Sequence, residues 1–233
     1  MIENPLMLQL PLNIQLDDSA QFDNFFVGGN QQLVARLEST VRSRGDLLYI
    51  WGARQSGKTH LAQALCHQFD LENKSAVYLP LGNSDLPAGI VEGLGEMDLV
   101  CVDDLDQVES DPDWEEKLFD LYNQLKENNA CLLVLSSSSP ANSNVQLPDL
   151  RSRLSAMEVY KIEALDDEQK FSLFQKRAAN RGLEISDEVA HFLLARQSRS
   201  VENLIQILEK IDHSSIALKR KVTIPLVKEI FNL

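Results

Sequence analysis

A short stretch near residue 55 combines residue types that can hold phosphate groups. Its residues, Gly52-Ala53-Arg54-Gln55-Ser56-Gly57-Lys58-Thr59, fit the pattern G-x-x-x-x-G-K-[ST]. Glycines in such a loop let backbone N–H groups turn toward a β-phosphate, and the helix that follows adds its positive N-terminus. Lys58 then reaches the β- and γ-phosphates, and the Thr59 hydroxyl binds Mg²⁺. The pattern predicts a nucleotide-binding loop. The alternative is a glycine-rich turn with a surface lysine.

The whole loop is a candidate for contact with a nucleotide. The expected contacts are Gly52, Ala53, Gln55, Ser56, Gly57, Lys58 and Thr59. His60 follows directly and is grouped with them, although packing is its expected role rather than chemistry.

Two aspartates supply the acidic half that such a site needs. Asp103 and Asp104 follow the apolar run 99–102, at the carboxyl end of an expected strand, where open α/β sheets bind ligands. We expect Asp103 to hold Mg²⁺ through water, together with Thr59, and Asp104 to orient an attacking water. Two aspartates after a strand can also form a plain turn, but the phosphate loop favours the functional interpretation.

The hydrophobic pattern predicts the elements that position these residues. Apolar runs predict strands at 46–51, 75–81, 97–106, 130–139 and 157–162, and helical periodicity appears at 32–41, 58–69 and 114–127. Strands that alternate with helices indicate a parallel sheet covered on both faces. After residue 162 the pattern is helical only, with Ser186 and Thr223 at expected N-caps and Gly182 at an expected helix stop.

The sequence therefore predicts an α/β fold with a five-stranded parallel sheet between helices and a small C-terminal helical lid. We expect an N-terminal tail over 1–21, a nucleotide-binding body over 22–163 and a lid over 164–233.

Composition limits the classes of function. The chain of 233 residues has 35 acidic and 22 basic residues and a net charge of −13, so its surface should repel a polyanion, which argues against strong direct DNA binding. We see no apolar run long enough to span a membrane and no secretory signal, so we expect a cytoplasmic protein. Cys66, Cys101 and Cys131 stand singly in apolar stretches and are expected to be small buried hydrophobes.

Body, lid, phosphate loop and acidic strand end together resemble an AAA+ module, and two further segments resemble its DnaA branch. The stretch FDNFFVGGNQQL at 22–33 resembles the segment that packs near the adenine, which implies that Phe26 and Val27 flank the base. The stretch LPDLRSRL at 147–154 resembles the segment that presents an arginine finger to a neighbouring subunit, which implies that role for Arg153. The alternative for Arg153 is a local surface ion pair.

No DnaA-type helix-turn-helix domain follows the lid, and the N-terminal tail is apolar. This combination resembles the Hda family, DnaA-related regulators that inactivate DnaA after replication starts. The resemblance implies that DnaA and the sliding clamp of DNA polymerase III are partners. Its clamp-binding peptide Q-L-x-L-P-L is matched by Met7-Leu8-Gln9-Leu10-Pro11-Leu12, with Met7 in place of the glutamine. The alternative is a tail that covers its own core.

Two positions depart from the family pattern. Ser137 is the nearest match to the first sensor, which is often Asp or Asn, and Glu202 stands where the lid should carry a sensor arginine. A glutamate near a γ-phosphate would repel it. The resemblance thus implies a bound adenine nucleotide, ADP or ATP, with Mg²⁺, and weak hydrolysis of that nucleotide.

Two main functions remain open at this stage. In the first, the chain is a negative regulator of replication initiation that, with the DNA-loaded clamp, promotes hydrolysis of DnaA-bound ATP through Arg153. In the second, it is a self-hydrolysing ATPase similar to a helicase loader or clamp loader. A metabolic kinase is a weaker third option, since no acceptor motif is visible. Arg153 could equally serve a homodimer.

Overall fold

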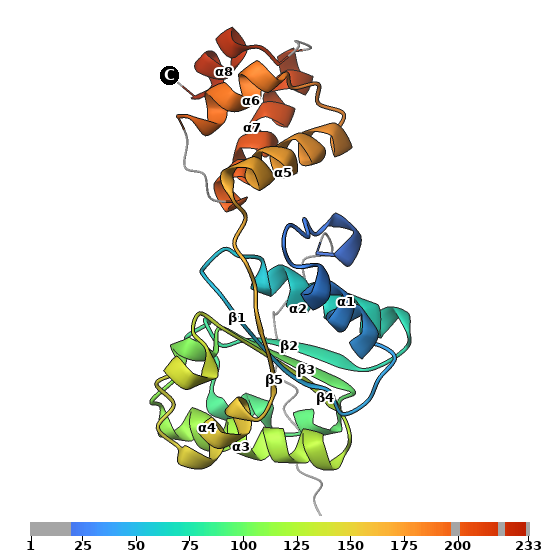
Figure 1. Ribbon diagram of the computed structural model, residues 1–233, viewed down its shortest axis with the longest axis vertical. Coiled ribbons are helices and arrows are strands. Elements are labelled where there is room, and N and C mark those ends of the chain that lie inside the picture. Colours follow the sequence, from blue (N-terminus) through green and yellow to red (C-terminus); the bar gives the residue numbers. More distant parts are fainter. Residues whose placement is uncertain (1–19, 197–200, 219–221, 232–233) are drawn as a thin grey trace, which may run out of the picture.

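The computed structural model describes residues 20–196, 201–218 and 222–231. Figure 1 shows two parts: an α/β body, and above it a group of helices that a single extended segment joins to the body. Within the described residues, no helix is both long enough and apolar enough to cross a bilayer.

The body is built on a sheet of five parallel strands. They are β1 (Leu47–Trp51), β2 (Ala76–Pro80), β3 (Leu99–Asp103), β4 (Cys131–Ser136) and β5 (Glu158–Lys161). Their order across the sheet is β2-β3-β4-β1-β5. The predicted sheet and its parallel pairing are confirmed. All carboxyl ends lie at one edge, where the loops after β1, β3 and β4 meet.

Helices cover both faces of this sheet. The helices α1 (Gln31–Thr40) and α2 (Lys58–Leu71) lie on one face, and α3 (Pro112–Glu127) and α4 (Pro148–Ser155) lie on the other (Figure 1). Because successive side chains of a strand point to opposite faces, Leu48 and Ile50 of β1 join the core under α1 and α2, whereas Tyr49 joins the core under α3 and α4. The central strands β3 and β4 are buried along their whole length, which explains their continuous apolar runs.

Short 3-10 helices complete the body. They are η1 (Phe22–Asn24), η2 (Ala88–Val91), η3 (Leu94–Glu96), η4 (Leu105–Gln107) and η5 (Pro140–Asn142).

The lid consists of α5 (Asp167–Asn180), α6 (Asp187–Leu194), α7 (Val201–Leu218) and α8 (Ile224–Phe231). It has a core of its own, centred on Phe174, Leu193, Leu208 and Ile211. The predicted N-cap at α6 is confirmed, because the Ser186 hydroxyl accepts a hydrogen bond from the Val189 amide. The α/β body with a C-terminal helical lid matches the predicted fold class.

Candidate nucleotide-binding site

The loop between β1 and α2 leaves no room for a side chain at two glycines. A Cβ atom on Gly52 would lie 2.5 Å from Ile162 Cγ2 and 2.8 Å from the Ile162 carbonyl oxygen. Gly57 has a φ of +100°, and a Cβ atom there would lie 2.8 Å from the Phe25 ring. Gly57 is also the N-cap of α2, so the first amides of that helix open onto the loop. This is the geometry of a phosphate cradle.

Lys58 and Thr59, the first residues of α2, lie against the acidic end of β3. Lys58 Nζ donates to the carbonyl oxygens of Gly52 (2.8 Å) and Ala53 (3.0 Å). Burial lowers the pKa of Lys58, and the nearby charge of Asp103 opposes this shift. Thr59 Oγ1 donates to Asp103 Oδ2 over 2.6 Å. The hydroxyl and the carboxylate that the sequence predicts for Mg²⁺ are therefore direct neighbours.

Tyr78 of β2 is a site residue that the sequence did not indicate. Its hydroxyl donates to Asp103 Oδ2 over 2.9 Å, and Asp103 itself is almost completely buried. Burial and the Asp103 charge raise the pKa of Tyr78 well above its ordinary value, so the phenol remains a donor. Nothing in the local sequence of β2 points to this role, because it depends on the neighbouring strand.

The loop after β3 carries two more carboxylates. Asp104 has a left-handed φ of 56°, and burial together with the Asp103 charge raises its pKa. Asp106 Oδ1 accepts hydrogen bonds from Ser136 Oγ (3.2 Å) and from the Ser137 amide (2.8 Å). The sequence indicates Ser137 as a candidate here, but it does not indicate Asp106. The one sequence feature that could have indicated Asp106 is its place as the third acidic residue of the stretch VDDLD, close to Asp103 and Asp104.

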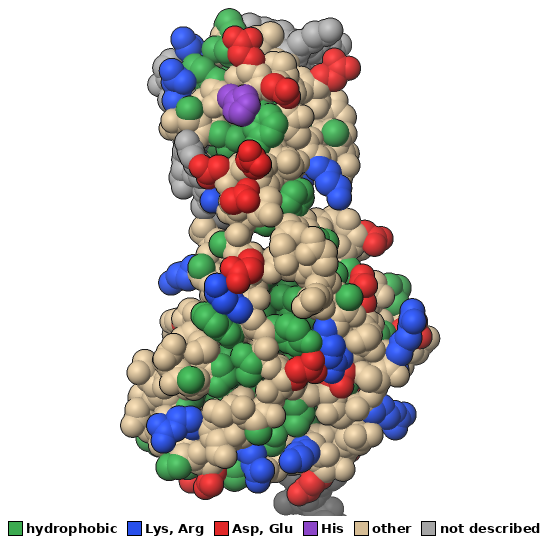
Figure 2. Space-filling model, in the orientation of Figure 1, with side chains coloured by type: hydrophobic (Ala, Val, Ile, Leu, Met, Phe, Trp, Pro, Cys, Tyr) green, Lys and Arg blue, Asp and Glu red, His purple; other side chains and the backbone are tan. Residues whose placement is uncertain are grey.

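Several of these residues line a large cleft between body and lid, about 1220 Å³ in volume. Figure 2 shows the molecule narrowing between the two parts. Of the predicted residues, the cleft brings together Phe26, Gln55, Ser56, Gly57, Lys58, Thr59, His60, Asp104 and Ser137. It also includes unpredicted residues, among them Phe25, Arg54, Gln63, Asp106, Lys170, Leu173 and Arg177. Four further predicted residues do not line it: Val27, Gly52, Ala53 and Asp103.

The aromatic side of the cleft differs from the expected pair of Phe26 and Val27. Phe26 lines the cleft, whereas Val27 packs against the core under α1 and α2. Phe25 lies against Gly57 of the phosphate loop, with its ring centroid 5.5 Å from that of His60. A ring nitrogen of His60 lies 2.9 Å from the Gln21 carbonyl oxygen, which fits the packing role expected for this histidine.

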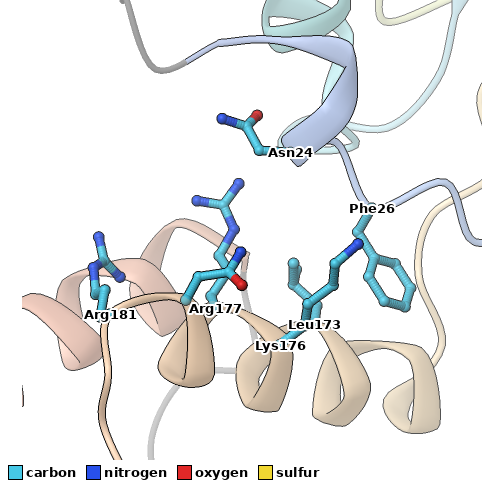
Figure 3. Close-up of a pocket in the computed structure, with 7 residues that line it drawn as sticks. Asn24, Phe26, Leu173, Lys176, Arg177 and Arg181 are labelled. Carbon is cyan, nitrogen blue, oxygen red and sulfur yellow. The ribbon is translucent and has the colours of Figure 1, made fainter.

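A smaller pocket of about 140 Å³ opens beside the cleft, between η1 and α5. Figure 3 shows Lys176 and Arg177 of α5 and Arg181, the C-cap of α5, in a row on one wall, with Asn24 opposite and Phe26 at the end. Phe26 and Arg177 line both this pocket and the cleft. The lid helix α5 therefore brings cations to the side of the cleft where Phe26 lies.

Arg153 lies on the opposite side of the sheet from α2. It is exposed on α4, and its guanidinium carbon is 5.8 Å from the centroid of the Tyr122 ring of α3. It is not among the residues that line the cleft. Its charge can therefore meet another molecule rather than the nucleotide of its own chain.

Two groups of predicted residues lie outside the described part of the chain. The clamp-binding candidates Met7, Leu8, Gln9, Leu10, Pro11 and Leu12 are one group, and the side chain of Glu202 is the other.

The donors present fit a nucleotide with a magnesium ion. Ser56 lines the cleft, and its Oγ is buried with no hydrogen-bond partner among the described residues. A phosphate oxygen in the cleft would supply the missing acceptor. A hydroxyl beside a carboxylate, as in Thr59 and Asp103, matches the hard oxygen ligands that Mg²⁺ prefers.

Comparison with known proteins agrees with this geometry. Residues 44–165 match the family model of an AAA domain, and residues 167–231 match the model of the Hda lid domain. An uncharacterized protein of Haemophilus influenzae is 40% identical over 231 residues, covering 97% of this chain and 99% of its own.

Solved structures share the fold at lower identity. Domain III of the replication initiation protein DnaA from Thermotoga maritima has a TM-score of 0.79 at 22% identity, covering 94% of this chain and 98% of its own. AMPPCP-bound DnaA from Aquifex aeolicus has a TM-score of 0.72 at 21% identity, covering 88% and 69%. The chain therefore belongs to the AAA domain family, and its C-terminal helices match the lid domain of Hda.

Proposed function

We propose that this protein is a negative regulator of replication initiation that promotes hydrolysis of DnaA-bound ATP through an arginine finger in trans. The observation that carries the proposal is the position of Arg153, exposed on α4 and outside the cleft of its own chain. A guanidinium that cannot serve its own nucleotide is available to the nucleotide of a partner. Fingers supplied in trans raise hydrolysis rates by roughly 10³–10⁵.

In this proposal the chain's own nucleotide, an adenine nucleotide with Mg²⁺, is mainly structural. Thr59 and Asp103 would hold the ion, which when bound neutralises phosphate charge. Lys58 and the amides of the loop would hold the phosphates, and Phe26 would contact the base. Because α5 lines the same cleft, a bound nucleotide joins lid to body and fixes the shape that DnaA meets.

The clamp supplies proximity in this scheme. The tail residues 7–12 would dock as an extended peptide in a hydrophobic groove of the sliding clamp, which raises the effective concentration of the protein near DnaA on DNA. Met7 in place of glutamine should weaken or shift this docking. A cytoplasmic location belongs to the same proposal, as does the expectation that the acidic chain does not bind DNA strongly by itself.

The test measures hydrolysis of ATP prebound to DnaA, with this protein and clamp loaded on DNA, and then with each component omitted. We expect stimulation that requires all components and that Arg153→Ala abolishes. Lys126, exposed at the end of α3, provides the control Lys126→Ala, which should stimulate normally. Arg153→Ala should also bind nucleotide normally; loss of binding would contradict the separation of roles.

A second candidate is a self-hydrolysing ATPase of the helicase-loader or clamp-loader kind. The observation in its favour is that Asp104 and Asp106 both face the cleft beside the phosphate loop, where either could orient a water. Turnover of ATP by the chain alone, with and without DNA, distinguishes the two. Strong DNA-stimulated turnover without DnaA would favour the loader.

A further inference from the structure

Glu115 of α3 is a buried carboxylate that forms no ion pair within the described part of the chain. Its side chain is 3% exposed, and its hydrogen-bond donors are backbone amides from two loops. Oε1 accepts from the amides of Ser110 (2.8 Å) and Gln146 (2.9 Å), and Oε2 accepts from those of Gln146 (3.0 Å) and Leu147 (2.6 Å). Charge-assisted hydrogen bonds of this kind are strong, so Glu115 holds the backbone of both loops firmly against α3.

The hydrogen bonds of Glu115 lie where α4 begins. The N-cap of α4 is Leu147, whose side chain cannot accept a hydrogen bond, and the next residue is Pro148. An ordinary helix start has a polar side chain to accept the first amides. Here Glu115 of α3 instead accepts hydrogen bonds from the amides of the N-cap Leu147 and of the preceding Gln146. It therefore holds the segment that leads into α4, and its charge lies near the positive end of the helix dipole.

The same helix also contacts the far end of α4. Tyr122 lies two turns after Glu115 on α3, and its ring faces the guanidinium of Arg153. Between these points, Leu118 of α3 shares a cluster with Leu150 and Leu154 of α4. The helix α3 therefore fixes the start of α4 through Glu115 and its end through Tyr122.

The loop after β3, which carries Asp104 and Asp106, is also held next to Glu115. Ser110 lies in the loop between β3 and α3. Besides its amide bond to Glu115, its hydroxyl donates to the Asn144 carbonyl oxygen over 3.1 Å. Glu109 Oε2 accepts from the Asn144 amide over 2.7 Å. The loop after β3 and the segment before α4 are thus held together next to Glu115.

We propose that Glu115 is a positioning residue for Arg153: by holding the segment that leads into α4 on α3, it sets where the Arg153 guanidinium lies when a partner's ATP binds. This inference rests on the proposed function of Arg153. A small displacement of a catalytic group can lower a rate by roughly 10²-fold. Because α4 has only 8 residues, a shift of its N-terminal end also moves Arg153.

The functional test compares Glu115→Ala with Glu116→Ala, an exposed neighbour. DnaA-bound ATP hydrolysis is measured over a range of concentrations of this protein. A misplaced finger lowers the rate at saturation, by about 10–100-fold, whereas partial unfolding only raises the concentration needed to reach it. Nucleotide affinity should stay within about twofold. An unchanged saturating rate in Glu115→Ala would overturn the proposal.

A second measurement is independent of DnaA. Side-chain NMR of Arg153 reports its place over the Tyr122 ring, and amide exchange reports the hydrogen bonds of Gln146 and Leu147. Glu115→Ala should shift the Arg153 signals and speed exchange at both amides, and Glu116→Ala should do neither. Unchanged Arg153 signals and unchanged amide exchange in Glu115→Ala would overturn the positioning role. Failure of the wild-type protein to stimulate hydrolysis of DnaA-bound ATP would refute the proposed function, and the NMR result would not depend on it. If Glu115→Ala does not fold, Glu115→Gln carries the same tests, because it keeps the shape and replaces one acceptor oxygen by a donor.

Discussion

At the scale of one residue, Asp104 places a carboxylate in the cleft that lowers the folding stability of the chain. Its φ of 56° is left-handed, and its carboxylate is partly buried near Asp103 and Asp106, so its pKa is raised. A raised carboxyl pKa means that the folded chain binds this proton more tightly than the unfolded chain does. Stability therefore falls as the pH rises through the window between the ordinary and the raised pKa, and the ionised group destabilises the fold at neutral pH.

We predict that Asp104→Asn raises the melting temperature at neutral pH in the absence of nucleotide and Mg²⁺. Asn tolerates the left-handed conformation as Asp does, so the gain comes from removing the charge. Each kcal/mol gained corresponds to about 2–4 °C for a chain of this size. The gain should disappear below the ordinary pKa of the carboxyl group, where both chains are neutral. Thermal unfolding followed across pH checks this.

Asp106 provides the matched comparison. Burial alone would raise its pKa, but hydrogen bonds from Ser137 and Gln107 outweigh burial, and the net shift is downward. Its charge therefore adds stability above the ordinary pKa, and that stability is lost as the pH falls. Asp106→Asn should accordingly lower the melting temperature at neutral pH. If both variants shift the melting temperature in the same direction, the electrostatic account of this loop is wrong.

At the scale of elements, the phosphate loop depends on close contact between β1 and the strand beside it. Gly52→Ala would place a methyl group 2.8 Å from the Ile162 carbonyl oxygen, a backbone atom that cannot turn away. We predict a loss of about 1–3 kcal/mol of folding stability and weaker nucleotide binding, measured by chemical unfolding and by titration with labelled ADP. Gly29→Ala is the control, because a Cβ atom there meets nothing within 4 Å. Equal effects of the two substitutions would contradict this explanation.

The strands and the phosphate loop could be predicted because their signals are local. A buried parallel strand must be apolar throughout, as β3 and β4 are, and the loop glycines must stand at fixed spacing. The helix α4 was not predicted as a helix: of its 8 residues only Leu150 and Leu154 are buried, too few to show a period. Its N-terminal acceptor, Glu115, comes from a distant part of the sequence.

The finer details of the site depend on tertiary packing. The sequence offers Phe25, Phe26 and Val27 in a row, and only the packed fold shows that Phe25 lies on Gly57 while Phe26 lines the cleft. Likewise, Asp106 meets the end of β4 because β3 and β4 are neighbours in the sheet. Such contacts between residues far apart in sequence leave no mark in a local pattern.

At the scale of the whole molecule, the cleft joins two parts that have separate cores. The segment between β5 and α5 is fixed to the body at its start, because Asn30 exchanges two hydrogen bonds with the backbone of Glu163 (2.8 and 3.1 Å). The residues that follow, Ala164 and Leu165, line the cleft. Any movement of the lid relative to the body must therefore pass through the short stretch from residue 164 to Asp166, the N-cap of α5.

A nucleotide that contacts both parts should stabilise the molecule as a unit. We predict that ADP with Mg²⁺ at 100 times its Kd adds about 2.7 kcal/mol of stability and slows cleavage by a broad-specificity protease near Leu165. Lys58→Ala should lose both effects while keeping its fold, because Lys58 Nζ donates to the loop carbonyl oxygens of Gly52 and Ala53 and holds no other described element in place. Thermal unfolding and limited proteolysis measure the two effects separately. Thermal stabilisation without protection of Leu165 would mean that the nucleotide binds the body alone, and the lid would then have no part in presenting Arg153 to a partner.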